Sequence, residues 1–180
     1  MGNEKEYVIR IPVILDEKTF RRFARFDMLK LRKKWRNPVF FTLIMSAFAA
    51  VALLSRKAQS GMIAAVLLAV GLGLPLVYFG SFLGQVNMQV LQYKLRPPKK
   101  VYAVAMGENG IRVENLQRKE APLIMEWDSI PQAFRGKGCI YLYVAPAKAF
   151  LLPDDQGNAE TEKVWEYLKE HMGTEKCKKA

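Results

Sequence analysis

The sequence predicts an α+β membrane protein in which a two-helix transmembrane hairpin precedes an antiparallel β domain closed by a C-terminal helix. Two apolar runs, 37–55 and 58–93, predict the hairpin, because neither contains Asp, Glu, Lys, Arg or His. Bilayer hydrocarbon is about 30 Å thick, and about 20 helical residues cross it. Residues 99–153 then show short strand-like segments separated by turn residues, which predict the β domain. We expect membrane spans at about 38–55 and 61–83.

The net charge of +11 is concentrated in the first third of the chain. Up to residue 57 there are thirteen Lys and Arg against five Asp and Glu. Lys and Arg beside membrane spans stay on the cytoplasmic side. Both outer flanks of the apolar runs carry basic clusters, whereas the loop between them holds only Arg56 and Lys57. We therefore expect a multi-pass protein of the cell (inner) membrane with both termini cytoplasmic.

The composition offers little for catalysis or metal binding. One histidine and two widely spaced cysteines form neither a disulfide framework nor a zinc cluster, and no Gly-rich phosphate loop occurs. We therefore predict no catalytic, cofactor-binding or metal-binding residues, no cofactor, and no enzyme. The first apolar run is not expected to be a cleaved signal sequence, because a strand-like and a helix-like segment precede it.

The N-terminal segment, residues 1–36, predicts a strand and then a basic amphipathic helix. Residues 7–15 alternate apolar side chains onto one face, and Pro12, which lacks an N–H, places this strand at a sheet edge. We expect it to join the C-terminal sheet. Asp16 is a candidate helix N-cap, and helical spacing continues to Trp35. The polar side of the helix carries the residues predicted to contact the membrane surface: Arg21, Arg22, Arg25, Arg32, Lys33 and Arg36.

This basic helix has two favoured interpretations. Lying on the membrane surface, it would bind anionic lipid with about 1 kcal/mol per basic residue near the headgroups. Alternatively, it sets the membrane topology and packs against the cytosolic domain. We expect no nucleic-acid partner, because the helix leads directly into an apolar span.

The hairpin region, residues 37–93, has small side chains at helical spacing, which let helices approach closely in lipid. The residues predicted to pack helix against helix are Ala65, Ala69, Gly73, Gly80 and Gly84. Either these residues pack the two spans against each other, or Gly80 and Gly84 form the contact of a homodimer. Pro75 predicts a kink in the second span. The absence of Asp, Glu, Lys, Arg and His from both spans argues against an ion or proton pathway.

Residues 94–172 predict the β domain, which follows a helix end at Pro97-Pro98. Asn109-Gly110 is typical of a tight turn between strands. The predicted strands are 100–106, 111–116, 123–127, 132–135, 139–144 and 148–152, and a helix is predicted at 159–172. Residues 173–180 are expected to form a disordered tail.

Several side chains of this domain have candidate roles. Trp127 and Ile130 are expected in the core, because Trp buries a large apolar area. Tyr141 and Tyr143 share one strand face, which either packs in the core or flanks a peptide groove. The carboxylates listed next lie in turns and are expected to be solvated: Asp128, Asp154 and Asp155.

Three stretches and the order of elements carry a family resemblance. Residues 126–130, with Trp127 and Ile130, residues 141–143, and residues 149–153, which end at Pro153, resemble the YcxB-like family of bacterial membrane proteins. The resemblance implies an N-terminal strand and helix, two adjacent membrane spans and a cytosolic pleckstrin-homology-like (PH-like) domain. It implies no known reaction. Members often place a basic residue after the closing proline, where this chain has Asp154, so a phosphoinositide-type pocket is in doubt.

The sequence thus favours a PH-like domain that binds a protein or a lipid headgroup at the inner leaflet. Its expected partners are a bilayer with an anionic inner leaflet, an unknown protein and a second copy of the chain. The alternative is a small oligomeric pore or transport accessory subunit assembled through the hairpin.

Overall fold

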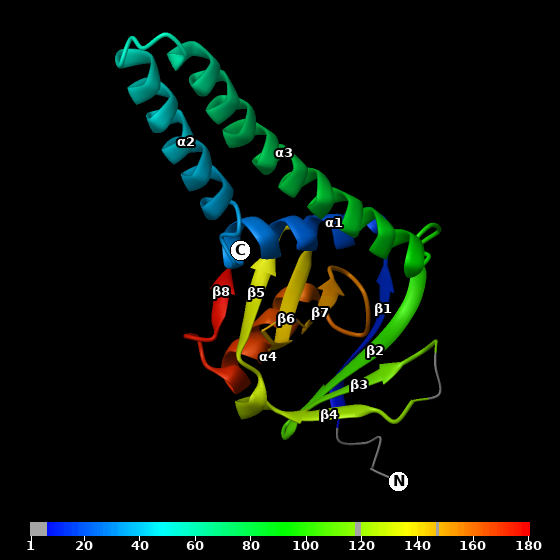
Figure 1. The fold of residues 1–180 in the computed structure, drawn as a ribbon. Helices are drawn as coiled ribbons and strands as arrows, with labels where there is room; N and C mark the ends of the chain where they lie inside the picture. The colour runs from blue at the N-terminus through cyan, green and yellow to red at the C-terminus, as the bar shows by residue number, and fades with distance from the viewer. Residues whose placement is uncertain (1–6, 118–119, 147) are drawn as a thin grey trace. The chain divides into compact units, whose positions relative to one another are not determined.

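The chain folds into two units in a computed structural model, which describes residues 7–117, 120–146 and 148–180 (Figure 1). The β unit comprises Met1–Phe23 and Tyr93–Ala180, and the helical unit comprises Ala24–Gln92. Two long apolar helices are followed by β-sheets and a C-terminal helix, which confirms the α+β class. The units divide after residues 23 and 92, whereas the sequence suggested boundaries after 36 and 93.

The β unit contains two four-stranded sheets. The first is antiparallel with the order β1 (Tyr7–Leu15), β2 (Lys99–Gly107), β3 (Gly110–Asn115) and β4 (Leu123–Glu126). The second has the order β7 (Lys148–Pro153), β6 (Cys139–Ala145), β5 (Gln132–Gly136) and β8 (Cys177–Lys179). A 3₁₀ turn, Trp127–Ser129, connects the two sheets between β4 and β5.

Strand β1 is the edge strand that its sequence predicts. It pairs antiparallel with β2, and Ile9, Ile11, Val13 and Leu15 are buried. On its outer edge the N–H of Arg10 donates to Asn158 Oδ1 (2.8 Å) and the N–H of Ile14 donates to Gln156 Oε1 (2.7 Å). Pro12 lies midway between Arg10 and Ile14, so its nitrogen faces the same outer edge and not β2. Its missing N–H therefore costs no hydrogen bond between the strands. The side chains of the 156–158 loop therefore protect the edge from pairing with another strand.

The β2–β3 hairpin turns through Glu108 and Asn109, with Gly107 opposite Gly110. Gly110 has φ +149°, and a Cβ there would lie 2.0 Å from the carbonyl oxygen of Met125. Only glycine fits this close approach of β4. The predicted turn is therefore confirmed.

The core of the β unit lies under α4 (Thr161–Met172), whose Val164, Trp165, Leu168 and Met172 are buried. Trp127 and Ile130 are buried as expected. The indole N–H of Trp127 lies 3.0 Å from the carbonyl oxygen of Gly107, so its polar atom is satisfied. Tyr141 and Tyr143 are each 1% exposed and belong to the core rather than to a groove.

The C-terminal segment differs from the disordered tail that the sequence suggested. Residues Cys177–Lys179 form β8, which pairs parallel with β5. The N–H of Ala133 donates to Lys176 O (2.9 Å), and the N–H of Ala180 donates to Arg135 O (3.0 Å). The open edge of β5 supplies these partners, and this tertiary pairing is invisible in the local composition of the tail.

The helical unit consists chiefly of α2 (Arg36–Leu54) and α3 (Ser60–Gln92), which run antiparallel side by side (Figure 1). The predicted spans fall on these helices, although α2 ends one residue before 55 and α3 continues past 83 to Gln92. The preceding α1 (Glu17–Phe26) starts in the β unit, where Asp16 Oδ1 accepts the N–H of Thr19 (2.9 Å) as a helix N-cap.

The basic helix predicted through Trp35 is interrupted. A π-helical turn, Asp27–Leu31, follows α1, and Lys33 has φ +48°. Pro38 explains the break, because a continuous helix would place its ring against the carbonyl of Lys34. In α2 the proline occupies the first turn, where N–H groups have no partner within the helix.

Candidate functional site

Both α2 and α3 are long and apolar enough to cross a membrane, and their apolar side chains face outward. In an apolar 18-residue stretch of each helix, only 6% of the residues of α2 and 11% of those of α3 are buried. Leu54 and Leu76 are 80% and 73% exposed. The apolar area of these two helices is therefore left without a partner within the helical unit.

The two helices meet through small side chains in the middle of the hairpin. Ala49 of α2 and Ala64 and Gly71 of α3 are buried. A Cβ on Gly71 would lie 2.7 Å from the Cβ of Met45, so glycine permits the close approach.

A hydrogen bond between the helices compensates for the proline in α3. Pro75 has no N–H to donate to the carbonyl oxygen of Gly71, four residues earlier. Thr42 Oγ1 of α2 lies 2.8 Å from that oxygen and 3.1 Å from Pro38 O. The Thr42 hydroxyl is thus placed to donate to the carbonyl that Pro75 leaves unpaired.

The small residues predicted to pack the spans do not make this contact. Ala65, Ala69, Gly80 and Gly84 are exposed, and outside the adjoining stretch of its own helix no atom lies within 4 Å of a Cβ built on Gly73. The reason is helical phase, since 3.6 residues make one turn. Ala64 and Gly71, seven residues apart, share a face, and Ala65 lies about 100° away from it. Contact between two copies through Gly80 and Gly84 stays a hypothesis.

The six cations predicted to contact the membrane surface have different surroundings. Arg21 pairs with Glu17 (2.6 Å), and Arg32 pairs with Asp27 (2.7 Å). Arg22 Nη1 donates to the carbonyl oxygen of Lys137 (2.5 Å). The remaining three, Arg25, Lys33 and Arg36, are exposed. Arg22 is exposed as well, but its guanidinium is engaged by the Lys137 carbonyl.

The apolar side of α1 packs on the β unit. The ring of Phe20 lies 6.1 Å from that of Tyr93, and the ring of Phe23 lies 5.4 Å from that of Tyr141 and 6.1 Å from that of Tyr143. For this first part of the basic segment, the contacts favour packing against the domain over burial in lipid.

The second part of the basic segment lines a pocket of about 550 Å³ beside α2, here called the outer pocket. It brings together three of the six predicted cations, Arg32, Lys33 and Arg36, with apolar side chains of the first turns of α2. Trp35 also lines it, and its indole N–H donates to Leu29 O (3.1 Å).

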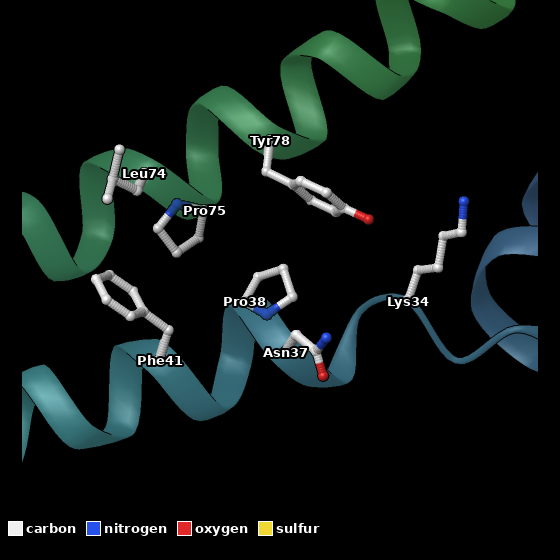
Figure 2. A pocket seen from close by; sticks show the side chains of 7 residues that line it. All are labelled: Lys34, Asn37, Pro38, Phe41, Leu74, Pro75 and Tyr78. Carbon is white, nitrogen blue, oxygen red and sulfur yellow. The ribbon is translucent and has the colours of Figure 1, made fainter.

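A second pocket, the hairpin pocket, opens between α2 and α3 with a volume of about 500 Å³ (Figure 2). Phe41 and Leu74 line its apolar end, and the Lys34 ammonium lies at the opposite end. The Tyr78 hydroxyl is directed toward the Lys34 side. The complete lining is Lys34, Asn37, Pro38, Phe41, Leu74, Pro75 and Tyr78.

The polar groups of the hairpin pocket are available to a ligand. Within the described ranges, no hydrogen bond or ion pair engages the Lys34 ammonium, the Asn37 amide or the Tyr78 hydroxyl. Lys34 belongs to the basic flank before the first apolar run, which the sequence analysis used only to predict topology, and Asn37 and Tyr78 were not predicted as site residues. The available signal was Tyr78 itself, a phenol three residues after a proline inside an otherwise apolar run.

The β unit contains polar contacts that hold its structure. Asp154, expected to be solvated, accepts hydrogen bonds from Nη1 (2.8 Å) and Nη2 (3.0 Å) of Arg135, and Glu162 accepts a hydrogen bond from Nη2 (3.1 Å). The Asp154 carboxylate raises the pKa of Arg135 above its ordinary value, with a further contribution from Glu162. The charge of Asp154, directly after Pro153, is therefore neutralised inside the unit.

The side chains best suited to nucleophilic or acid–base chemistry are engaged in packing. Burial raises the pKa of the Cys139 thiol to about 12, so it is protonated at neutral pH. The ring of His171 stacks on Tyr167 with 4.0 Å between centroids, and its Nδ1 lies 2.9 Å from Tyr167 O. No group of three metal-ligating side chains occurs among the residues that the structure describes.

No protein-family model, curated protein or solved structure matches the chain. The class that the fold supports is an α+β protein with two helices capable of spanning a membrane.

Proposed function

We propose that the protein is integral to the bacterial inner membrane, with the hairpin α2–α3 crossing the bilayer twice and the β unit in the cytoplasm. The observation that carries this proposal is the outward exposure of the apolar side chains of both helices. Lipid tails supply the surroundings that these side chains lack within the helical unit. At 1.5 Å per residue, the 19 residues of α2 span about 29 Å, close to the thickness of bilayer hydrocarbon.

Two further features support insertion. Proline is tolerated in membrane helices when a neighbouring helix pairs the freed carbonyl, and Thr42 lies in position to do so for Pro75. Trp35 and Tyr78 lie at the end of the hairpin that carries the basic flank, as is typical of aromatic residues at a membrane surface.

We propose that the cytoplasmic side is the side of the two chain ends. The basic flanks before α2 and after α3 support this orientation under the positive-inside rule. The exposed cations Lys33 and Arg36 would contact the headgroups of the anionic leaflet.

For the β unit we propose a PH-like binding module of the YcxB-like kind, which recognises a protein or a lipid headgroup. The order β1-β2-β3-β4, the second sheet and the packed helix α4 support this assignment. The packing of Cys139 and His171 favours binding over catalysis.

Accessible cysteines test the proposed sidedness in intact cells. The background is Cys177→Ser, in which buried Cys139 stays because it is unreactive. Gln59→Cys, in the loop between α2 and α3, should react with a membrane-impermeant maleimide. Glu166→Cys, exposed on α4, should react only after the cells are opened.

If Glu166→Cys were labelled in intact cells and Gln59→Cys were protected, the orientation would be the opposite of the one proposed. Equal labelling of both variants in intact cells would contradict a spanning hairpin. A reaction of the background protein would show that Cys139 is accessible, and the Cys139→Ala background would then be used for the same comparison.

A further inference from the structure

We infer that the hairpin pocket binds one anionic phospholipid, with the headgroup phosphate on Lys34, Asn37 and Tyr78 and one acyl chain against Phe41 and Leu74. This inference rests on the proposed insertion of the hairpin and adds a specific ligand site to it.

The polarity of the pocket matches a molecule with a charged end and an apolar end. Its apolar lining comes from Phe41, Leu74 and the rings of Pro38 and Pro75. Its polar lining comes from Lys34 at the other end and from Asn37 and the Tyr78 hydroxyl, which lie between the apolar end and Lys34 (Figure 2). Phospholipids have this same succession of phosphate and hydrocarbon at the membrane surface.

The three polar groups supply the contacts that a phosphate ester needs. A Lys ammonium is a common point-charge partner of phosphate, while an amide N–H₂ and a phenol O–H donate neutral hydrogen bonds. No protein group within the described ranges occupies these donors. In lipid they have a strong preference for an acceptor, because unpaired polar groups are costly away from water.

The local charge favours an anion over a zwitterion. Lys33 and Arg36 lie next to Lys34 and Asn37 in the chain and are exposed. The acid of this region, Asp27, lines a smaller adjacent cavity that shares Lys34 and Tyr78, and its carboxylate is paired with Arg32 (2.7 Å). The field at the pocket mouth is therefore positive.

The backbone gives the pocket a defined wall. Pro75 and Pro38 both line it, and the Thr42–Gly71 hydrogen bond joins the two helices beside it. Lys34 comes from the segment between the π-helical turn and α2, so the break in the basic helix positions the cation.

Native mass spectrometry of the full chain in a neutral detergent tests the inference. The purified, delipidated protein is titrated with phosphatidylglycerol and, separately, with phosphatidylcholine of the same chains. We expect one phosphatidylglycerol per chain, bound about tenfold more tightly than phosphatidylcholine. Equal binding of the two lipids would overturn headgroup recognition.

Matched variants separate a site from general charge attraction. Lys34→Gln should weaken phosphatidylglycerol binding about tenfold, since it removes a charged hydrogen bond. Lys30→Gln makes the same charge change at an exposed residue of the same basic segment, outside the hairpin pocket, and should change the affinity less than about twofold. Equal losses in the two variants would show diffuse attraction and overturn the inference.

Two further arms define the ligand. Phe41→Trp should reduce binding of the lipid by filling the apolar end, whereas Phe48→Trp, on the exposed surface of α2, should not. Glycerol phosphate in solution should not compete at lipid concentrations, and effective competition would assign the site to a free phosphate ester instead. If the protein stays in washed membranes but does not bind the lipid, only this inference is refuted. If the chain is soluble without detergent, the proposed insertion is refuted.

Discussion

At the scale of single residues, the hairpin depends on three positions that complement one another. Pro75 removes a donor, Gly71 is left with an unpaired carbonyl, and Thr42 of the other helix lies 2.8 Å from that carbonyl. The proline therefore couples the two helices, because the hydroxyl has a partner only when they are correctly aligned. Interhelical hydrogen bonds of this kind contribute about 0.6 kcal/mol and at most about 2 kcal/mol in membrane proteins.

Thr42→Val should lower the stability of the hairpin by about 1 kcal/mol, because Val keeps the shape and removes the hydroxyl. Thr42→Ser is the matched control and should keep most of the stability. In the Pro75→Ala background the backbone regains an N–H that pairs with the Gly71 carbonyl, so Thr42→Val should cost little there. Thermal unfolding in detergent measures this cycle, and an equal cost of Thr42→Val in both backgrounds would show that the hydrogen bond is unimportant.

Gly71→Ala should destabilise the hairpin by about 1–3 kcal/mol, because its Cβ would lie 2.7 Å from the Cβ of Met45. Gly80→Ala is the contrasting variant in the same helix, since no atom beyond the adjoining stretch of its own helix lies within 4 Å of its Cβ. It should be neutral or slightly stabilising through better helix propensity. Similar effects of the two variants would mean that the helices do not meet at Gly71. A loss of dimer only in Gly80→Ala would support the homodimer hypothesis.

At the scale of elements, α1 illustrates how the termini of a helix are fixed by charge. Asp16 caps its first turn. Burial raises the pKa of Asp16, but hydrogen bonds, chiefly from Thr19, and the charge of Lys18 together lower it below its ordinary value. A hydrogen bond from Arg96 lowers the pKa of Glu17 from 4.5 to about 2, with a further contribution from Arg21. Glu17 lies at the start of α1, directly after β1, and Arg96 lies just before β2. This ion pair therefore joins the segment that leaves the first sheet to the segment that returns to it.

The stability of the β unit should fall as the pH drops from about 4.5 towards 2, partly because Glu17 is then protonated. The sign follows from a folded-state pKa below that of the unfolded chain, which makes the contribution complete above pH 4.5. Glu17→Gln should reduce the acid-induced decrease in melting temperature, and Glu166→Gln, on the exposed face of α4, should not. The same pH profile in wild type and Glu17→Gln would contradict the role of this ion pair.

The strands show which elements the sequence determines locally. The alternation in residues 7–15 and the proline at its edge predicted β1, and Asn109-Gly110 predicted the turn before β3, because each signal lies within a few residues. The missed β8 and the interruption of the basic helix have long-range or steric causes. The first depends on the open edge of β5, and the second depends on Pro38 acting on Lys34.

At the scale of the whole molecule, the helical unit is an insertion in the sequence between β1 and β2, the first two strands of one sheet. Strands β1 and β2 are neighbours although α1, α2 and α3 separate them in sequence. Folding of the β unit therefore requires residues from both sides of the hairpin, so truncation between them removes an edge of the sheet.

The candidate site was only partly predictable for the same reason. The cations Arg32, Lys33 and Arg36 follow from local charge, and the outer pocket gathers them because they are close in sequence. The hairpin pocket joins Lys34 and Asn37 to Tyr78 across two antiparallel helices. Their proximity depends on how the helices pair, and the predicted packing residues lay on a different face from Gly71.

Extraction of membranes tests most directly whether lipid surrounds α2 and α3. Membranes from cells that express the full chain are washed with alkaline carbonate and sedimented, and the pellet is then treated with detergent. The exposed apolar faces of both helices predict that the chain stays in the washed pellet and is released only by detergent. Release by carbonate as a monodisperse, folded protein without detergent would contradict the membrane-spanning hairpin.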